Sequence, residues 1–211
     1  MMNKILLIFY NIICKYFIPL RFFYETRNTQ TPIKLKYWFW QKVFGFNRKV
    51  YWPVHFTSIV SGFENIYAGI DTSPGYMPGC YIQGAGRIDI GDYTQISANV
   101  GLISSNHYIE DTRKHHIEFI KIGKYCWIGM NSIILPGVIL GDHTVVGAGS
   151  VVTKSFPNGY CVIAGNPAKL IKNISIESCI KFKNEFEYNG YIKTKNFINF
   201  SRKKLKLSEI K

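Results

Sequence analysis

The chain has few acidic residues. Only 13 Asp and Glu stand against 26 Lys and Arg, which gives a formal net charge of +13 and a pI of about 9.5. A strongly basic chain favours anionic partners such as nucleic acid, a phospholipid surface or phosphorylated small molecules. No nucleic-acid-binding motif accompanies the charge, so we expect no nucleic-acid partner. A general richness in Lys, Ile and Asn is the alternative source of the basicity.

The sequence also lacks paired cysteines. Its five Cys are scattered, odd in number and without CxxC or Cys/His spacing: Cys14, Cys80, Cys126, Cys161 and Cys179. Neither a disulfide framework nor a zinc site is indicated, and no metal is expected. This pattern fits a reducing, cytoplasmic setting. The length of 211 residues allows one substantial core.

A long uncharged apolar run is absent as well. Residues 1–24 are mostly apolar, but three basic residues interrupt them: Lys4, Lys15 and Arg21. The uncharged runs that remain are shorter than the length that spans a bilayer. No small-residue cleavage site follows, which argues against a signal peptide. Two interpretations stay open: a helix that packs on the main domain or a neighbouring subunit, or an interfacial helix at the inner face of the membrane. The aromatic-rich stretch 34–46 is expected to form a second helix or an edge segment in a core or interface.

What the sequence does contain is a six-residue repeat from 122 to 155. Its lead positions are all β-branched or Leu, and Gly follows four of them: Ile122, Ile128, Ile134, Leu140, Val146 and Val152. Small or β-branched residues lie four places after the leads at Ser132, Val138, Thr144 and Ser150. A step of six scatters residues around an α-helix but keeps them on one face of a strand. Fixed hexapeptides therefore predict a parallel β-helix, with about eighteen residues per three-sided coil and the Gly supplying a positive-φ corner.

The same rhythm begins weakly earlier and is broken once. Leads occur at Val54, Val60 and Ile66, lapse over 72–79, and resume at Ile90, Ile96 and Leu102. The phase before residue 103 differs by two from the phase after 122. A coil that keeps its register must eject the extra residues, so residues 104–120 are expected to form an external loop, the kind of segment that carries function. This loop holds three of the five His.

These motifs resemble one known family. The stretches Cys126-Trp-Ile-Gly129, Ile134-Leu-Pro-Gly-Val138, 146–154 and Ala164-Gly-Asn-Pro-Ala-Lys169 resemble the hexapeptide-repeat O-acetyltransferases, which include galactoside, maltose, streptogramin, capsule and O-antigen acetyltransferases. The resemblance implies an all-β solenoid, a left-handed parallel β-helix, assembled as a homotrimer with active sites between subunits. It also implies acetyl-coenzyme A as the acyl donor, whose phosphates account for part of the basic charge.

The resemblance assigns the general base to His107, in the external loop. A neutral imidazole can take the proton of a sugar hydroxyl as that hydroxyl attacks a thioester. Glu110 or Asp111 is the candidate to orient the imidazole. Asn106 is expected either to contact the acceptor or to hold a turn, and Trp127 to line the acetyl pocket. His115 and His116 are alternates for the base, while His55 and His143 are interpreted as surface or corner residues.

By the same resemblance the coenzyme lies on the later coils. Gly147 and Ala148 offer close approach to its pantetheine arm, and Thr153 with Lys154 lie near its phosphates. The turn at Asn166 precedes basic residues matched to the nucleotide phosphate, Lys169 and Lys172. Lys stands where relatives often have Arg, which gives a point charge in place of a bidentate contact. Met130 stands where the galactoside enzyme's pattern has a Ser, so a side-chain hydrogen bond to the coenzyme is not expected there. The acceptor residues of the galactoside enzyme find no match in Gly75 to Arg87, so a different acceptor is expected.

The chain is thus divided into an N-terminal helical and aromatic extension (1–50), the β-helix acyltransferase domain (51–172) and a C-terminal helix with a basic tail (173–211). A helix over 175–191 is expected to cap the open end of the coil, followed by a tail that is mobile or rests on an anionic surface. The expected function is acetyl transfer to a sugar hydroxyl of a surface glycan or its precursor. N-acetylation of an amino sugar and a non-catalytic scaffold are the alternatives.

Overall fold

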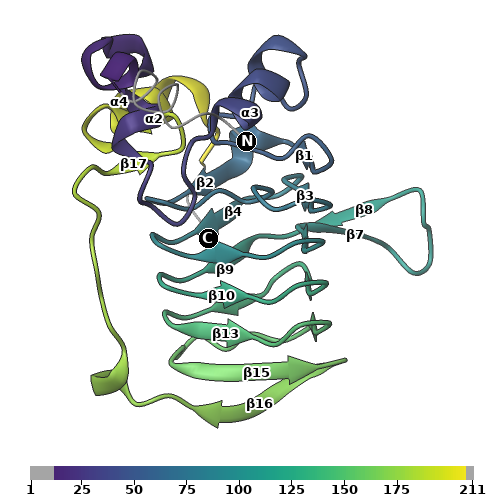
Figure 1. The fold of residues 1–211 in the computed structure, drawn as a ribbon. Coiled ribbons are helices and arrows are strands. Elements are labelled where there is room, and N and C mark those ends of the chain that lie inside the picture. Colours follow the sequence, from purple (N-terminus) through teal and green to yellow (C-terminus); the bar gives the residue numbers. More distant parts are fainter. Residues whose placement is uncertain (1–11, 208–211) are drawn as a thin grey trace.

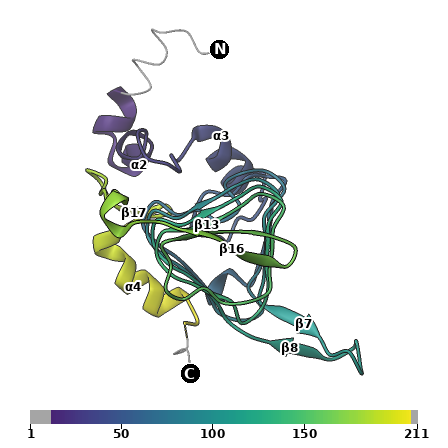
Figure 2. The same cartoon turned by 90° about the horizontal axis from the view of Figure 1, so that it is seen from below.

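Three sheets form the sides of a prism that is triangular when viewed along its axis (Figure 2). The structure is a computed structural model and describes residues 12–207. Sheet A is formed by β1 (Ile59–Ser61), β3 (Tyr81–Gln83), β6 (Gly101–Ile103), β11 (Ile133–Ile134) and β14 (Val151–Val152). Sheet B is formed by β2 (Ile66–Ala68), β4 (Ile88–Ile90), β9 (Ile120–Ile122) and β12 (Ile139–Leu140). Sheet C is formed by β5 (Gln95–Ile96), β10 (Trp127–Ile128), β13 (Thr144–Val146), β15 (Cys161–Gly165) and β16 (Ala168–Asn173).

The chain visits sheets A, B and C in turn, and the circuits from β3 to β13 lay one strand on each sheet (Figure 1). Within these three sheets, strand pairing is parallel except between β15 and β16. In the later coils the register advances by eighteen residues, as from Ile133 to Val151 and from Trp127 to Val145. The expected three-sided parallel coil is therefore present.

The predicted lead residues fill the core of this coil. All six leads of the 122–155 repeat are at most 2% exposed, and the four small or β-branched residues placed after them are at most 1% exposed. The earlier residues Ile66, Ile82, Ile88 and Ile90 are fully buried in the same cluster. At about 25 cal/mol per Å² of apolar surface, this continuous stack is the main stabilising term of the domain.

The glycines that follow the leads act differently from our expectation. Positive φ falls two residues later, at Tyr125 (56°), Asn131 (60°) and His143 (52°), and the prediction of positive φ at the glycines themselves is wrong. A Cβ on Gly123 would lie 2.5 Å from the amide nitrogen of Asp142, and one on Gly129 would lie 2.5 Å from the carbonyl oxygen of Val146. These glycines are needed because stacked coils approach each other too closely for a side chain.

The C-terminal segment departs from the prediction. β16 folds back antiparallel on β15 at the last coil. The expected capping helix over 175–191 is wrong, because the only helical segment within this range is the short 3-10 turn η4 (Ile176–Ser178). The chain then runs back along the side of the prism to its N-terminal end (Figure 1). There it forms β17 (Tyr188–Asn189), β18 (Ile192–Lys193) and α4 (Thr194–Lys204). Residues 194–204 of the expected tail form α4, whose Phe197 is 6% exposed, so this part of the tail is packed and not mobile.

The returning segment is held by a column of rings at the corner between sheets B and C. Tyr93, Tyr125, His143 and Tyr160 stack with centroids 5.0–5.3 Å apart. Tyr125 donates a hydrogen bond to the carbonyl of Phe182 at 2.8 Å. His143 was interpreted as a surface or corner residue; it is a corner residue, but it is only 9% exposed, and burial lowers its pKa.

The N-terminal extension packs on the same end of the prism as α4 (Figure 1). It contains helical residues 12–16, the 3-10 turn η1 (Ile18–Leu20), α2 (Arg21–Glu25), α3 (Leu35–Trp38) and the π-helical turn η2 (Phe39–Val43). A small second core joins Cys14, Phe23 and Ile33 to Tyr191 of the C-terminal segment. In the described part of the 1–24 stretch, Cys14 and Phe23 thus pack within the chain, whereas other apolar side chains are exposed: Ile12, Ile13, Tyr16 and Phe17. Residues 1–11 lie outside the described residues. The 3-10 turn η3 (Phe63–Asn65) lies between β1 and β2. Across residues 12–207, no helix is long and apolar enough to cross a bilayer.

Candidate active site

The expected external loop is a β-hairpin at the corner between sheets A and B. β7 (Ser105–His107) pairs antiparallel with β8 (His115–Ile117), and the ribbon projects sideways from the prism (Figures 1 and 2). At its base the amide of Glu118 donates to the carbonyl of Ser104 at 2.9 Å, and the fully buried Ser104 hydroxyl accepts from the amide of Gly86 at 2.9 Å. Ile90 pairs with Ile122 across 32 residues in place of 18, so the hairpin absorbs the insertion and the coil keeps its register.

His107 is exposed on this hairpin, and one of its ring nitrogens is occupied. Nδ1 contacts the carbonyl oxygen of Thr112 across the hairpin turn. A carbonyl can only accept, so Nδ1 carries the proton and Nε2 keeps its lone pair. The ring of His115, the cross-strand partner of His107, lies 4.3 Å from it between centroids. The imidazole is therefore held in the tautomer that a general base requires.

The acidic residues of the loop do not take the expected place beside His107. Asp111 accepts from the Arg113 guanidinium at 2.8 Å, and that contact lowers the pKa of the Asp111 carboxyl. Glu110 is exposed, and no contact joins it to His107 within the described residues. The orienting acid predicted at Glu110 or Asp111 is replaced by the Thr112 carbonyl, because the turn closes its own backbone onto Nδ1.

Asn106 lies in β7, so the alternative that it holds a turn is wrong. Its cross-strand partner is His116, whereas His107 pairs with His115. Successive strand residues face opposite sides, so Asn106 and His107 point to opposite faces of the ribbon. On the Asn106 face, Nε2 of His116 lies 2.7 Å from the Glu118 carboxylate.

Trp127 lies on a different part of the prism. It is the first residue of β10 in sheet C, is 55% exposed, and donates from Nε1 to the Ser97 hydroxyl at 3.1 Å. The corner between sheets C and A follows it directly. One coil later the same corner contains Gly147, Ala148 and Gly149.

This second corner offers accessible backbone. Ala148 and Gly149 are exposed, and nothing lies within 4 Å of a Cβ built on Gly149. The amides of Gly147 and Gly149 donate to neighbouring coils at 2.8 Å, whereas the described residues provide no acceptor for the amide of Ala148. Asn166 is exposed at the next level, in the turn between β15 and β16. An extended amide-containing ligand can therefore lie along this corner.

The remaining predicted residues are exposed cations and a hydroxyl. Thr153 and Lys154 follow β14 at the corner of sheets A and B, below the hairpin that carries His107. Lys169 and Lys172 lie on β16 at the end of the prism. The predicted site thus divides between two corners: His107, Thr153 and Lys154 at the A/B corner, and Trp127, Ala148 and Asn166 at the C/A corner.

A family model and several known proteins match the repeat region of this chain. Residues 119–154 match the family described as "Bacterial transferase hexapeptide (six repeats)". The chain carries the hexapeptide repeat of bacterial transferases. The expected resemblance of this hexapeptide-repeat protein to the hexapeptide acetyltransferases is thereby confirmed.

Individual proteins and a solved structure are similar to this chain over the repeat region. The galactoside O-acetyltransferase of Escherichia coli K12 is 39% identical over 92 residues, which are 42% of this chain and 45% of that protein. A Dictyostelium discoideum protein is 50% identical over 95 residues, 43% of this chain and 50% of its own. The structure of a galactoside acetyltransferase in complex with coenzyme A aligns with a TM-score of 0.58 and 25% identity over 82% of this chain and 88% of that one. The chain spans about half the length of the curated relatives it matches.

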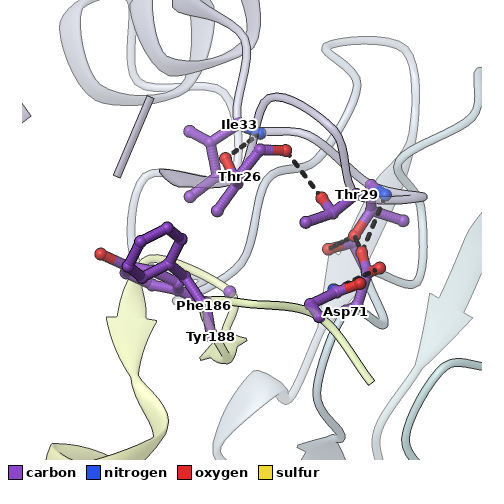
Figure 3. Close-up of a pocket in the computed structure, with 10 residues that line it drawn as sticks. Thr26, Thr29, Ile33, Asp71, Phe186 and Tyr188 are labelled. Atoms are coloured by element: carbon purple, nitrogen blue, oxygen red, sulfur yellow. Dashed lines mark hydrogen bonds between the residues drawn. The ribbon is translucent and has the colours of Figure 1, made fainter. Parts of the chain in front are cut away.

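A separate hollow lies away from both corners, where the N-terminal extension meets the returning C-terminal segment (Figure 3). Its buried acid, Asp71, accepts hydrogen bonds from the amides of Gln30 and Thr31 at 3.0 and 2.9 Å. The Asn184 side chain donates to the same carboxylate at 2.9 Å. The chain itself thus occupies both carboxylate oxygens, and Asp71 joins the two extensions.

Proposed function

We propose that this protein is an acetyl-CoA-dependent O-acetyltransferase that acts on a sugar hydroxyl of a surface glycan or its precursor. We include in the proposal a left-handed coil and a homotrimer with active sites between subunits, as in the family it resembles. The observation that carries the proposal is the contact of His107 Nδ1 with the Thr112 carbonyl, since it leaves Nε2 as an exposed proton acceptor.

The proposed reaction uses that nitrogen directly. Nε2 takes the proton of the acceptor hydroxyl as the oxygen attacks the thioester carbonyl of acetyl-coenzyme A. When the tetrahedral intermediate collapses, the carbon–sulfur bond breaks and the imidazolium returns the proton to the leaving thiolate. The products are the acetyl ester and free coenzyme A, and His107 is restored. The Thr112 carbonyl stabilises the imidazolium formed in between.

Two observations support a site shared by subunits. Within one chain the A/B and C/A corners lie at opposite edges of sheet A, so His107 and Trp127 do not face each other. The outer row of sheet A is apolar, with Ile59, Tyr81 and Ile133 exposed by 59%, 42% and 38% in register with Gly101 and Val151. The corresponding row of sheet B contains Asp89 and Lys121. An apolar row flanked by both half-sites fits an interface around a three-fold axis.

The positions of His107 and Trp127 along the axis of the prism also support a trimer. The hairpin leaves the coil immediately before β9, and Trp127 lies in the coil that β9 begins. A three-fold axis parallel to the coil axis preserves height, so His107 of one subunit comes level with Trp127 of the next. On that arrangement the C/A corner of one subunit offers Ala148 and Gly147 to the pantetheine arm. The cations Lys154, Lys169 and Lys172 supply charge for the phosphates.

The test is a set of assays with labelled acetyl-coenzyme A and a panel of nucleotide sugars and glycan fragments. Replacing His107 with Ala should lower turnover by about 100- to 10,000-fold and leave coenzyme A binding, measured by calorimetry, unchanged. The matched control is His116→Ala on the opposite face of the hairpin, which should retain activity. Acetylation of an amino sugar at nitrogen would favour the N-acetyltransferase, and absence of coenzyme A binding would favour a non-catalytic scaffold.

A further inference from the structure

The net positive charge of this protein comes from its two extensions. Residues 1–50 contain nine Lys and Arg and a single acid, Glu25. Residues 51–172, which form the coil, contain eight basic and eight acidic residues. Residues 173–211 contain nine basic and four acidic residues, so the extensions account for the whole net charge of +13. The excess of basic over acidic residues therefore lies outside the coil that carries the proposed coenzyme site.

Both extensions lie at one end of the prism. The N-terminal helices, β17 and α4 are clustered at the end where the first coil begins (Figure 1). Glu25 is 9% exposed and its carboxylate is paired with Lys193 of the C-terminal segment. Among residues 12–50 the surface consequently carries cations without an exposed acid. α4 adds Lys195, Arg202, Lys203 and Lys204 and contains no acid.

Exposed apolar side chains accompany these cations. We call the group Leu35, Phe39, Val43, Phe44 and Phe46, with the exposed Lys36 and Lys49, the aromatic-basic face. Phe44 and Phe46 are 56% and 45% exposed. They are positioned by Trp40, whose ring lies 4.8 Å from that of Phe44 and 5.9 Å from that of Phe46. A fixed apolar patch of this kind, rimmed by cations, marks a binding surface.

We propose that the aromatic-basic face docks this protein on an anionic phospholipid bilayer. Aromatic rings partition into the interfacial region, while Lys and Arg contact the headgroups. A nucleic acid or an acidic soluble chain would use the cations but would leave the aliphatic and aromatic side chains in water. The combination of both kinds of side chain at one end of the molecule favours a lipid surface.

The position of the face suits a flat partner. α3, which carries Leu35 and Lys36, lies at the level of the first coil (Figure 1) and beside the triangular outline of the prism, on the side away from the hairpin (Figure 2). In the trimer of the proposed function, the first-coil ends of the three subunits point the same way along the three-fold axis, so one bilayer can contact all three at once. Docking does not depend on acetyl transfer, because the face shares no residue with the proposed active site.

The experiment is co-sedimentation of the full chain with phosphatidylcholine vesicles, with or without about 30% phosphatidylglycerol, at about 0.15 M salt. We expect binding to the anionic vesicles that weakens as salt rises. The double variant Phe44→Ser/Phe46→Ser should bind at least about tenfold more weakly. The double variant Lys36→Gln/Lys49→Gln leaves the aromatic packing intact, and its affinity for the anionic vesicles should fall about fivefold for each lysine replaced.

The matched control is Leu170→Ser/Ile171→Ser, which removes two apolar side chains, 51% and 62% exposed, from the other end of the prism. It should bind vesicles like the unchanged protein. Absence of binding to anionic vesicles would refute the proposal. An equal loss of vesicle binding in the control would also refute it. So would equally tight binding to an oligonucleotide, if the phenylalanine variant retains that binding. A change of oligomeric state in the phenylalanine variant without weaker vesicle binding would refute it as well. Coenzyme A binding in the same samples separates this outcome from failure of the proposed function.

Discussion

The Lys193 ammonium lies 2.9 Å from the carboxylate of Glu25, 168 residues away in sequence. The Tyr188 hydroxyl donates to the same carboxylate oxygen, Oε2, and burial together with that contact raises the pKa of Tyr188. Through this clasp the N-terminal helices and the returning C-terminal segment hold each other on the first coil. It also explains why the only acid of the first 50 residues adds no exposed negative charge.

The clasp predicts that Glu25→Ala loosens both extensions together. Loss of the carboxylate leaves a half-buried ammonium unpaired, which should cost about 1–3 kcal/mol of unfolding free energy. Limited proteolysis should then cut both extensions faster, while the coil resists. Arg113→Gln, which breaks an exposed pair in the hairpin, should leave proteolysis of the extensions unchanged. Equal protection of the two variants would argue against the clasp.

The coil was predictable because its signal is local and repeated. The leads from Ile122 to Val152 recur at an even spacing that only stacked strands can bury together, and each repeats the same information. The hairpin was predictable because it shifts the phase by two residues. The return of the C-terminal segment was not, since its contacts join Phe182 to Tyr93 and Tyr125 over long sequence distances. No periodicity records such pairs.

The candidate site was predictable in its residue types but less so in its contacts. The inserted loop and the family resemblance single out His107 as the candidate base, which stays a prediction. Its partner is the backbone carbonyl of Thr112, and a carbonyl carries no sequence signal. Likewise the Ser97 hydroxyl that fixes Trp127 lies 30 residues earlier, at a distance set by the inserted hairpin. Ser97 lies two residues after Gln95, which pairs with Trp127 in the preceding coil, and this position was the only sequence signal for the contact.

Trp127 should contribute to coenzyme binding without contributing to folding. Its ring is 55% exposed, so Trp127→Ala removes little buried surface, but it would remove one wall of the proposed pantetheine groove. We expect the Kd for coenzyme A to rise about tenfold, as for loss of one aromatic contact, with an unchanged melting temperature. Calorimetric titration measures the first and thermal unfolding the second. Phe39→Ala, an exposed aromatic of the far extension, is the control and should bind coenzyme A normally.

Variants of two glycines test whether the coil needs glycine for close approach between coils or for positive φ. Gly123→Ala places a methyl 2.5 Å from the Asp142 amide nitrogen in the next coil, where neither backbone can retreat. We expect a loss of about 3 kcal/mol or more, because overpacking of a stacked core strains both coils. Gly149→Ala meets no atom within 4 Å but keeps a φ of 70°, so its cost should be about 1–2 kcal/mol. Denaturant midpoints compare the two directly; the reverse order would show that positive φ, and not close approach, is the reason for glycine here.

Burial of the Cys126 thiol should make it unreactive in the folded protein and should make the stability of the fold depend on pH. Burial raises the pKa of Cys126 from 9.0 to about 12. Because the thiolate is disfavoured in the folded state, the unfolded chain releases this proton first. The neutral thiol's contribution to stability is therefore full below pH 9 and declines as pH rises from 9 toward 12. At pH 8 a disulfide reagent should modify the half-buried Cys179 quickly and Cys126 only on unfolding. The Cys126→Ala variant should lose part of the stability decline above pH 9, and rapid labelling of Cys126 in the folded protein would mean that the corner between sheets B and C opens.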